Sequence, residues 1–457
     1  MDPTLLLTHS LRRNAWGDRV GRIMAAALSA VDPANAVEEH VQRAGAMLTA
    51  GGMSYDLDQF QRIFLIGAGK AGAPMAETVA RLVGPSLKRG IIITKDGYDR
   101  HARSTLPDCV EIIPAGHPLP DQRGIDASQR IINMLADIQR EDFVICVISG
   151  GGSALLTAPY PGITLAELRI LTGALIACGA SIDEINTLRK HLDCLKGGGL
   201  ARLAFPATLL SLVLSDVVGS PLEVIASGPA VPDPTLFGDA KAVLQRYNLA
   251  EQIPASILEH LNKGAFGDIP ETPKPGDAIF ERVLNIIVGS NYQAAAAALT
   301  QATTEGFHTL LLTTYLEGEA RQAGQALAAI ARQIDATGQP IPRPACVVAG
   351  GETTVTLRGD GLGGRNQELA LGAVLELADI PNAALVALAT DGGDGPTDAA
   401  GAVATGDTLS RARQLGLDPV DFLDRNDAYH FFAPLDDLLR TGPTFTNVND
   451  LELLFLF

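Results

Sequence analysis

The chain has 457 residues, of which 47% are hydrophobic and 19% charged, so it is long enough for two or three domains with large cores. Its formal net charge of −17 disfavours nucleic acid and anionic membranes as partners. The five cysteines are widely spaced without a CxxC motif, which argues against a disulfide framework or a zinc site. With no signal-peptide pattern and no apolar run of about 18 residues, we expect a cytoplasmic protein, either a monomer or a homodimer.

Helices are expected first, within residues 18–50. Short apolar strands then alternate with helices, which predicts an α/β fold with mostly parallel, Rossmann-like sheets. Two α/β domains are predicted, over residues 1–240 and 279–457, with a connecting segment over 241–278 that is richer in Pro, Gly and polar residues. The predicted strands are 63–66, 91–94, 110–113, 143–148 and 208–214 in the first domain and 283–288, 309–312, 345–349, 353–357, 384–389 and 450–457 in the second.

Ligands of open α/β sheets bind beyond the carboxyl ends of the strands, so the loops after the predicted strands are the candidate sites. The first loop, Gly67–Gly72, reads GAGKAG and matches G-x-G-x-x-G between a strand and a helix. With Asp96 near the end of the next strand, this is a fair dinucleotide fingerprint. We favour an anion site made by Gly67, Gly69 and Lys70 over the dinucleotide loop, and a tight turn that carries a solvated lysine is the further alternative.

A second glycine loop follows the strand at 143–148. Three consecutive glycines, Gly150, Gly151 and Gly152, can expose successive N–H groups between the hydroxyls of Ser149 and Ser153. This pattern favours an anion-binding loop over a purely structural turn.

A basic cluster lies further along the chain, at residues 189–196. Arg189 and Lys196 are seven residues apart, which would place them on one face of a helix. Lys190 and Lys196 are candidate phosphate ligands, although a solvated helix face or packing between domains explains the cluster as well.

The third loop begins after the strand at 208–214. Asp216 there could bind Mg²⁺ or accept a proton from a substrate hydroxyl, or it could cap a turn. In the fourth loop, Gly364, Arg365 and Asn366 lead into a helix, where Arg365 could clamp a carboxylate or phosphate, although a surface arginine without a ligand is the alternative.

The fifth loop, TDGGDGPT at 390–397, contains two acids within four residues, Asp391 and Asp394. Two acids on a glycine-rich loop suit a hard cation such as Mg²⁺. The alternative is a turn that carries acidic side chains without binding a metal ion. The five loops together offer cations, exposed N–H groups and acids, but no G-x-S-x-G elbow. Phosphoryl transfer needs this combination.

At these residues the sequence resembles the class II glycerate 2-kinases, a family with a C-terminal MOFRL domain. The resemblance implies two α/β domains with the active site in the cleft between them. It also implies ATP- and Mg²⁺-dependent transfer to the C2 hydroxyl of D-glycerate, giving 2-phosphoglycerate. Lys70 and Arg365 match cationic residues of the family, and Asp216 and Asp394 match acids of its motifs. The matching stretches are GAGKAG, ISGGGSALL, LRKHLDCLKGGGLA, LSDVVGSPLEVIASGP, GGETTVTLRGDGLGGRNQELALG, ATDGGDGPTDAAGA and TGPTFTNVND.

The chain departs from that family pattern at four positions. They are Asp193, Ser220, Leu362 and Phe445. The gain of an acid and the loss of a basic residue could alter substrate preference. The main alternative function is an NAD(P)H-dependent hydroxypyruvate reductase, and a non-catalytic metabolite sensor is a third. Lys70 favours the kinase, because a dinucleotide loop works by close backbone approach and needs no cation there.

Overall fold

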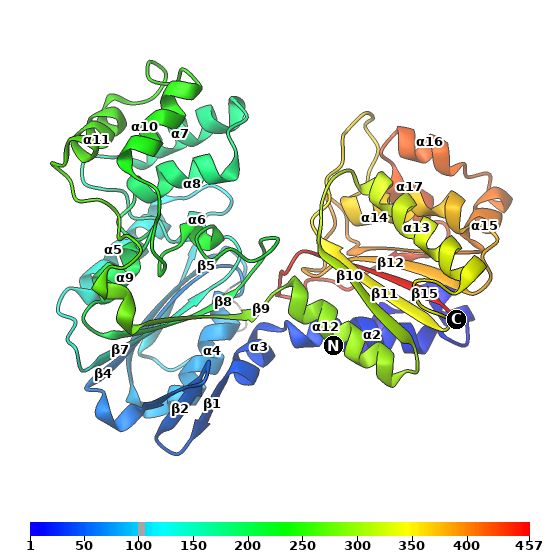
Figure 1. The fold of residues 1–457 in the computed structure, drawn as a ribbon, viewed down its shortest axis with the longest axis horizontal. Helices are drawn as coiled ribbons and strands as arrows, with labels where there is room; N and C mark the ends of the chain where they lie inside the picture. The colour runs from blue at the N-terminus through cyan, green and yellow to red at the C-terminus, as the bar shows by residue number, and fades with distance from the viewer. Residues whose placement is uncertain (99–105) are drawn as a thin grey trace. The chain divides into compact units, whose positions relative to one another are not determined.

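The computed structural model describes residues 1–98 and 106–457. The chain forms two compact units (Figure 1). The N-terminal unit comprises Ala36–Ser215 and Ser220–Val288, and the C-terminal unit comprises Met1–Asn35, Asp216–Gly219 and Gly289–Phe457. The division differs from the expected 1–240 and 279–457, because the first 35 residues join the C-terminal unit and the segment after 240 joins the N-terminal one.

The N-terminal unit is built on a six-stranded sheet in the order β6-β5-β4-β7-β8-β9. From β6 to β8 every neighbouring pair is parallel, as predicted. Its central strand β7 is buried throughout, as expected for a parallel strand covered on both faces. The strand at 283–288 was assigned to the second domain, but it is the edge strand β9 of this sheet. The strands are β4 (Arg62–Ala68), β5 (Leu87–Lys95), β6 (Val110–Ala115), β7 (Asp142–Ile148), β8 (Thr208–Leu214) and β9 (Val283–Gly289).

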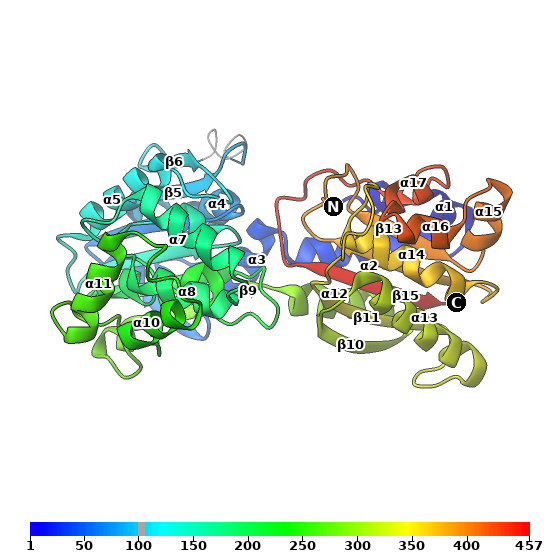
Figure 2. The same cartoon turned by 90° about the horizontal axis from the view of Figure 1, so that it is seen from above.

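Four helices of this unit pack together into a second apolar core, seen beyond one end of the sheet in Figure 1 and in front of its strands in Figure 2. Capping boxes at Thr164 with Glu167 and at Ser181 with Glu184 fix where two of them begin. The four are α7 (Leu165–Ala177), α8 (Ile182–His191), α10 (Phe237–Arg246) and α11 (Ala255–Phe266). The remaining helices are α3 (Pro33–His40), which begins before the unit boundary, α4 (Gly72–Val83), α5 (Gln122–Leu135), α6 (Gly152–Leu155) and α9 (Gly199–Ala204).

The predicted helical region at 18–50 ends early. After α2 (Gly17–Ala30) and α3, the chain forms a small antiparallel sheet, β1 (Val41–Ala44), β2 (Met47–Ala50) and β3 (Met53–Asp56). Gly45, Gly51 and Gly52 lie at its turns with φ of 62°, 55° and 79°. Such left-handed conformations interrupt a helix and favour hairpins.

The C-terminal unit contains a mixed sheet in the order β10-β11-β15-β12-β13-β14. Only β10 and β11 pair in parallel, whereas the other neighbours are antiparallel, so the expectation of mostly parallel sheets fails here. The apolar tail was correctly predicted as a strand, and it occupies the interior of the sheet. The predicted strand at 353–357 is not formed; Thr354 makes one isolated bridge to Glu319. The strands are β10 (His308–Leu316), β11 (Ala345–Gly351), β12 (Ala383–Ala389), β13 (Gly401–Thr405), β14 (Leu438–Leu439) and β15 (Asp450–Leu456).

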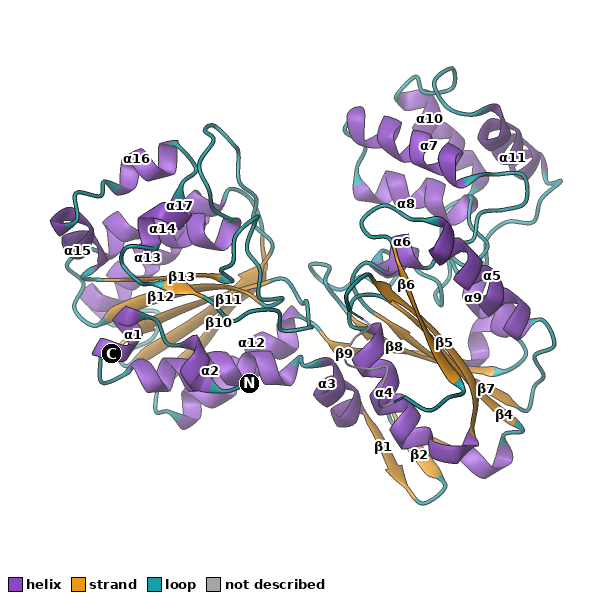
Figure 3. Cartoon of the chain, turned by 180° about the vertical axis from the view of Figure 1, so that it is seen from behind, coloured by secondary structure: helices purple, strands orange, loops and turns teal. Residues whose placement is uncertain are grey.

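Helices cover both faces of this sheet (Figure 3). Small residues and leucines of α13 (Ala320–Thr337) and α14 (Arg365–Leu377) pack on one face and form the main core. On the other face lie α12 (Asn291–Thr304) and α2, which explains why the N-terminal helices belong to this unit. The remaining helices are α1 (His9–Arg13), α15 (Thr408–Gln414), α16 (Pro419–Asp424) and α17 (Ala428–Phe432). No helix in the part of the chain that the structure describes is long and apolar enough to cross a membrane.

Candidate active site

The glycine-rich loop after β4 has no backbone N–H groups to offer to a ligand. Each N–H from Gly69 to Gly72 donates a hydrogen bond to another atom of the protein. The acceptors, in chain order, are Ile93 O at 3.1 Å, Gly150 O at 2.9 Å, Ser149 Oγ at 2.9 Å and Gly69 O at 3.1 Å. The expectation that these helix-start amides hold an anion is therefore wrong, and only the side chain of Lys70 remains for that purpose.

The glycines of this loop are explained by packing. A Cβ on Gly67 would lie 2.7 Å from Val147 Cγ2. A Cβ on Gly69, which has φ of 133°, would lie 2.1 Å from Ser149 Oγ. Distances below 3.0 Å are not tolerated, so both glycines allow the segment after β4 to lie against the neighbouring strand β7 and the loop after it.

The second glycine loop does offer free amides. Among the residues that the structure describes, the N–H groups of Gly150 and Gly151 have no hydrogen-bond acceptor. The half-buried ammonium group of Lys70, whose backbone N–H bonds to Gly150 O, forms no ion pair within residues 1–98 and 106–457. A cation and two unused donors at adjacent strand ends form an anion-binding arrangement.

A histidine that sequence analysis missed completes this end of the sheet. His117 lies just after β6, and a Cβ added to Gly151 would come within 2.8 Å of its Cδ2 atom. Burial, together with the charges of Lys70 and Lys95, lowers the pKa of His117 to about 4. The imidazole is therefore neutral near pH 7, a state in which one ring nitrogen donates and the other accepts. Only its place just after a predicted strand could have identified it.

The two lysines predicted as phosphate ligands are buried in ion pairs instead. Lys190 Nζ lies 3.4 Å from Asp233 Oδ1. Lys196 Nζ lies 2.8 Å from Asp193 Oδ2 and donates to Leu156 O at 2.6 Å. Asp193, one of the departures from the family pattern, thus neutralises the neighbouring cation.

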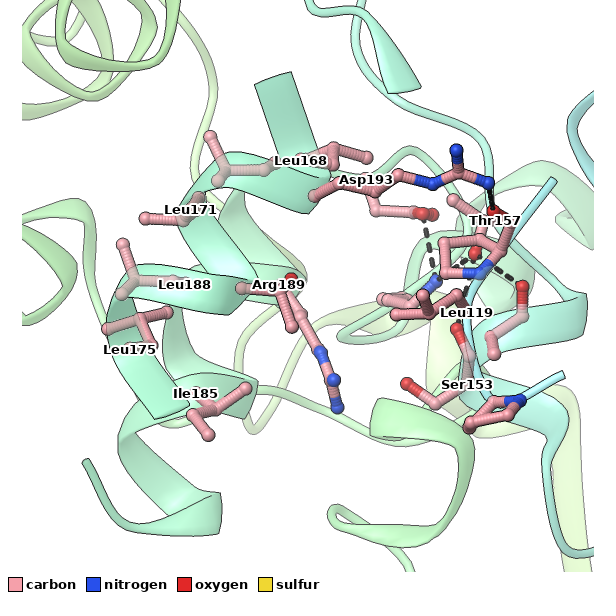
Figure 4. Close-up of a pocket in the computed structure, with 17 residues that line it drawn as sticks. Leu119, Ser153, Thr157, Leu168, Leu171, Leu175, Ile185, Leu188, Arg189 and Asp193 are labelled. Carbon is pink, nitrogen blue, oxygen red and sulfur yellow. Dashed lines mark hydrogen bonds and ion pairs between the residues drawn. The ribbon is translucent and has the colours of Figure 1, made fainter. Parts of the chain in front are cut away.

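Arg189 from the same cluster is placed differently. It lies in the last turn of α8, with its side chain directed into a pocket lined by α7, α8 and the segment that contains Ser153 (Figure 4). From the sequence, Arg189 is a member of the basic cluster but is not among the predicted ligands.

In the C-terminal unit, Asp394 caps a helix. The residue is 2% exposed, and its carboxylate accepts from the backbone N–H groups of Asn366 at 3.1 Å and Gln367 at 2.9 Å. A Cβ on Gly364 would lie 2.3 Å from Asp394 Cγ. The anion at the start of α14 is therefore the protein's own carboxylate, and Gly364 and Asn366 serve that contact. Burial raises the pKa of Asp394 even though these hydrogen bonds lower it.

Asp391 lies on the rim of a separate pocket of about 780 Å³ that Gly364 and Arg365 also line. One of its oxygens accepts from the N–H of Gly393 at 3.0 Å. Within the described ranges, no three His, Cys, Asp or Glu side chains are grouped so as to hold a metal ion.

Arg365 is anchored by two acids. Its Nε and Nη2 donate to Asp450 at 2.5 and 3.1 Å, and Nη1 donates to Glu352 at 2.6 Å. Burial lowers the pKa of Arg365, but the charges of Asp450 and Glu352 outweigh it and raise the value above the ordinary one. Burial raises the pKa of Asp450 to about 6 although Arg365 acts against it. Two of the five guanidinium N–H groups stay available for a ligand.

The predicted site residues thus form two groups. Lys70 and the Ser149–Ser153 loop lie together in the N-terminal unit, and Arg365 with Asp391 and Asp394 lies in the C-terminal unit. Asp216 lies two residues after the end of β8, in the segment Asp216–Gly219, which is grouped with the C-terminal unit.

The structure is that of a two-unit α/β protein with an anion-binding loop. Comparisons with known proteins identify the protein family to which the chain belongs. A family model described as a domain of unknown function, DUF4147, matches residues 19–262, and the MOFRL family matches residues 345–450. The chain is similar to a crystal structure of a Pyrococcus horikoshii protein, with a TM-score of 0.87, 38% identity and coverage of 96% of this chain and 98% of that one.

Relatives whose names state an activity identify the family more closely. The glycerate 2-kinase of Pyrococcus horikoshii is 38% identical, over 94% of this chain and 95% of the relative. The D-glycerate 2-kinase of Thermotoga maritima is 41% identical, over 85% and 89% respectively. A protein of Agrobacterium vitis, provisionally named a hydroxypyruvate reductase, is 41% identical over 86% and 87%. The chain belongs to the class II glycerate 2-kinase family, and the resemblance found in the sequence is confirmed.

Proposed function

We propose that the chain is an ATP-dependent kinase that phosphorylates the C2 hydroxyl of D-glycerate to give 2-phosphoglycerate. The observation that carries the proposal is the Lys70 ammonium group beside the N–H groups of Gly150 and Gly151, none of which has a partner within residues 1–98 and 106–457. Relatives named glycerate 2-kinase and D-glycerate 2-kinase support the choice of acceptor. The five free cysteines support a reducing cytoplasm as its compartment.

Each of the predicted groups has a task in phosphoryl transfer. The Lys70 ammonium group neutralises negative charge on the phosphoryl oxygens, and the N–H groups of Gly150 and Gly151 donate to them. Neutral His117 adds a donor or acceptor without adding charge. Asp216 is our candidate for accepting the proton of the substrate hydroxyl. Arg365 is our candidate for a second anion clamp, through its two remaining N–H groups.

Mg²⁺ accompanies ATP in most kinases, but the two acids predicted to bind it do not form a preformed cage. Both oxygens of Asp394 accept hydrogen bonds from the start of α14, so this residue does not fit as a direct ligand. Asp391 is the remaining carboxylate of that loop. An Mg²⁺ ion held chiefly by phosphate oxygens and water, as is usual for nucleotide kinases, needs no more than one such residue.

Two observations argue against the alternative function, an NAD(P)H-dependent hydroxypyruvate reductase. A dinucleotide-binding loop approaches the pyrophosphate with free backbone N–H groups, and those of residues 69–72 are all used within the protein. The acid that would bind the ribose, Asp96, is held by Arg123 through two hydrogen bonds of 2.8 and 2.7 Å.

The test is a coupled assay of the purified protein with ATP, Mg²⁺ and D-glycerate, in which the phosphoglycerate isomer is identified. We expect 2-phosphoglycerate, with no oxidation of NADH or NADPH by hydroxypyruvate. Formation of 3-phosphoglycerate would contradict the proposed position of transfer. Robust NAD(P)H oxidation would favour the reductase.

Gly151→Ala should lower kcat/KM at least about tenfold, because the new Cβ would displace His117 from the phosphoryl site. Gly151 also has φ of 84°, which costs an alanine about 1 kcal/mol in any surroundings. Gly162→Ala is the matched control, since Gly162 has φ of 94° with nothing within 4 Å. Steady-state kinetics should separate the two variants, and equal activity would show that His117 has no role.

A further inference from the structure

The pocket beside Arg189 has two chemically different walls. One wall consists of apolar side chains of α7 and α8, including Leu171, Leu175 and Leu188. The opposite wall carries the hydroxyl groups of Ser153 and Thr157 (Figure 4). The pocket volume is about 70 Å³, which suits a small molecule or a part of one.

Arg189 brings a charge into this pocket that no acid balances. In the part of the chain that the structure describes, its guanidinium hydrogen-bonds only to the neutral Asn186 Oδ1, at 3.4 Å. Burial lowers the pKa of Arg189, and no carboxylate contributes to it. An uncompensated charge in a partly desolvated position costs free energy, and an anionic ligand removes that cost.

The other charged side chains of the pocket are either paired with each other or exposed to solvent. Lys196 and Asp193 both line the pocket, but they neutralise each other across 2.8 Å. The exposed Arg169 at the rim donates to Pro120 O. The interior therefore carries one net positive charge, which favours an anion with one negative charge over a dianion.

A hydrogen-bond relay connects this charge to the phosphoryl-binding loop. Asn186 Oδ1 accepts from Ser227 Oγ at 3.0 Å, and Ser227 Oγ lies 2.8 Å from Ser153 Oγ. Ser227 and its neighbour Ala226 have φ of 61° and 50°, a left-handed conformation that non-glycine residues adopt at a cost. The strained turn thus holds Ser227 between the glycine loop and α8.

We propose that Arg189 binds the carboxylate of the small hydroxy-acid substrate, with the carbon chain against the leucine wall and Ser153 beside the hydroxyl groups. This assignment rests on the proposed function, because it places the acceptor of the same reaction next to the loop that holds the phosphoryl group. The single net charge makes the pocket selective for short monocarboxylates. Dicarboxylates and acids that already carry a phosphate fit it poorly.

The first experiment compares Arg189→Gln with Arg246→Gln, which removes the same charge from an exposed position of the same unit. For Arg189→Gln we expect a rise of about tenfold or more in the KM for D-glycerate, the size typical of a lost charge-assisted contact. The KM for ATP should stay within about threefold, a change below 1 kcal/mol. Arg189→Lys should recover part of the loss, and Arg246→Gln should behave like the parent. An unchanged KM for D-glycerate, or an equal rise for ATP, would overturn the assignment.

A second experiment does not depend on turnover. Isothermal titration of the full chain without nucleotide should show that D-glycerate binds more tightly than its uncharged amide, and that Arg189→Gln abolishes this preference. If the parent makes no phosphoglycerate but still prefers the acid through Arg189, the binding site stands and the kinase proposal fails. If the parent is an active kinase and the variant keeps the preference for the acid, the kinase stands and the binding site fails.

Discussion

Replacing Lys70 with alanine is expected to lower kcat/KM for phosphoryl transfer by about a hundredfold to a thousandfold, as for other groups that stabilise charge in a transition state. The ammonium group has no ion-pair partner among the described residues, so its removal leaves no buried acid unpaired. The free energy of unfolding should therefore hardly change. Steady-state kinetics and thermal unfolding of the same preparation give both quantities.

Lys88→Ala is the matched control for that experiment. Lys88 is exposed on β5 of the same unit, so its loss changes the net charge equally without touching the glycine loops. Near-normal turnover in Lys70→Ala would contradict the phosphoryl-binding site. A large fall in both variants would point to a general electrostatic effect, which added salt would reproduce in the parent.

The fold of the N-terminal sheet could be predicted from the sequence because parallel buried strands are continuous apolar runs with a characteristic spacing. The mixed sheet of the C-terminal unit could not. The run at 450–457 predicts a strand, but its direction depends on long-range pairing with β11 and β12. The position of β9 is a similar case, since the intervening helices α10 and α11 return the chain to the first sheet.

For the candidate site too, the sequence predicts the loops but not the contacts of individual atoms. The sequence correctly indicates that glycine loops follow β4 and β7, but it cannot tell which N–H groups the protein itself uses. Lys196 and Asp193 are three residues apart on the chain and pair with each other, whereas Arg189 in the same cluster has no acidic partner among the residues that the structure describes. Aspartate is a residue type that commonly binds metal ions, but the surroundings of Asp394 are those of a helix cap. Such differences arise from tertiary contacts that motif spacing does not encode.

Arg365→Lys should lower kcat/KM by about tenfold or more, which corresponds to about 1.4 kcal/mol. The guanidinium spans Asp450 and Glu352 with three hydrogen bonds, and lysine keeps the charge without that planar fork. Arg332→Lys on the exposed face of α13 is the control. Full activity in Arg365→Lys would exclude a clamp that depends on guanidinium geometry.

Arg365→Gln tests the structural side of the same residue through pH. Asp450 has its pKa raised from 3.8 to about 6 while Arg365 is still present, so removing the guanidinium raises it further. An acid with a raised pKa in the folded state binds a proton that the unfolded chain releases, so its ionisation costs stability as pH rises through the folded-state value. We therefore expect Arg365→Gln to lose about 3 kcal/mol of unfolding free energy at pH 8, near the lower end for breaking a buried pair because the side chain of Arg365 is 32% exposed. Most of that loss should disappear near pH 5. A loss independent of pH, measured by urea unfolding across that range, would show that the pairing with Asp450 does not control stability.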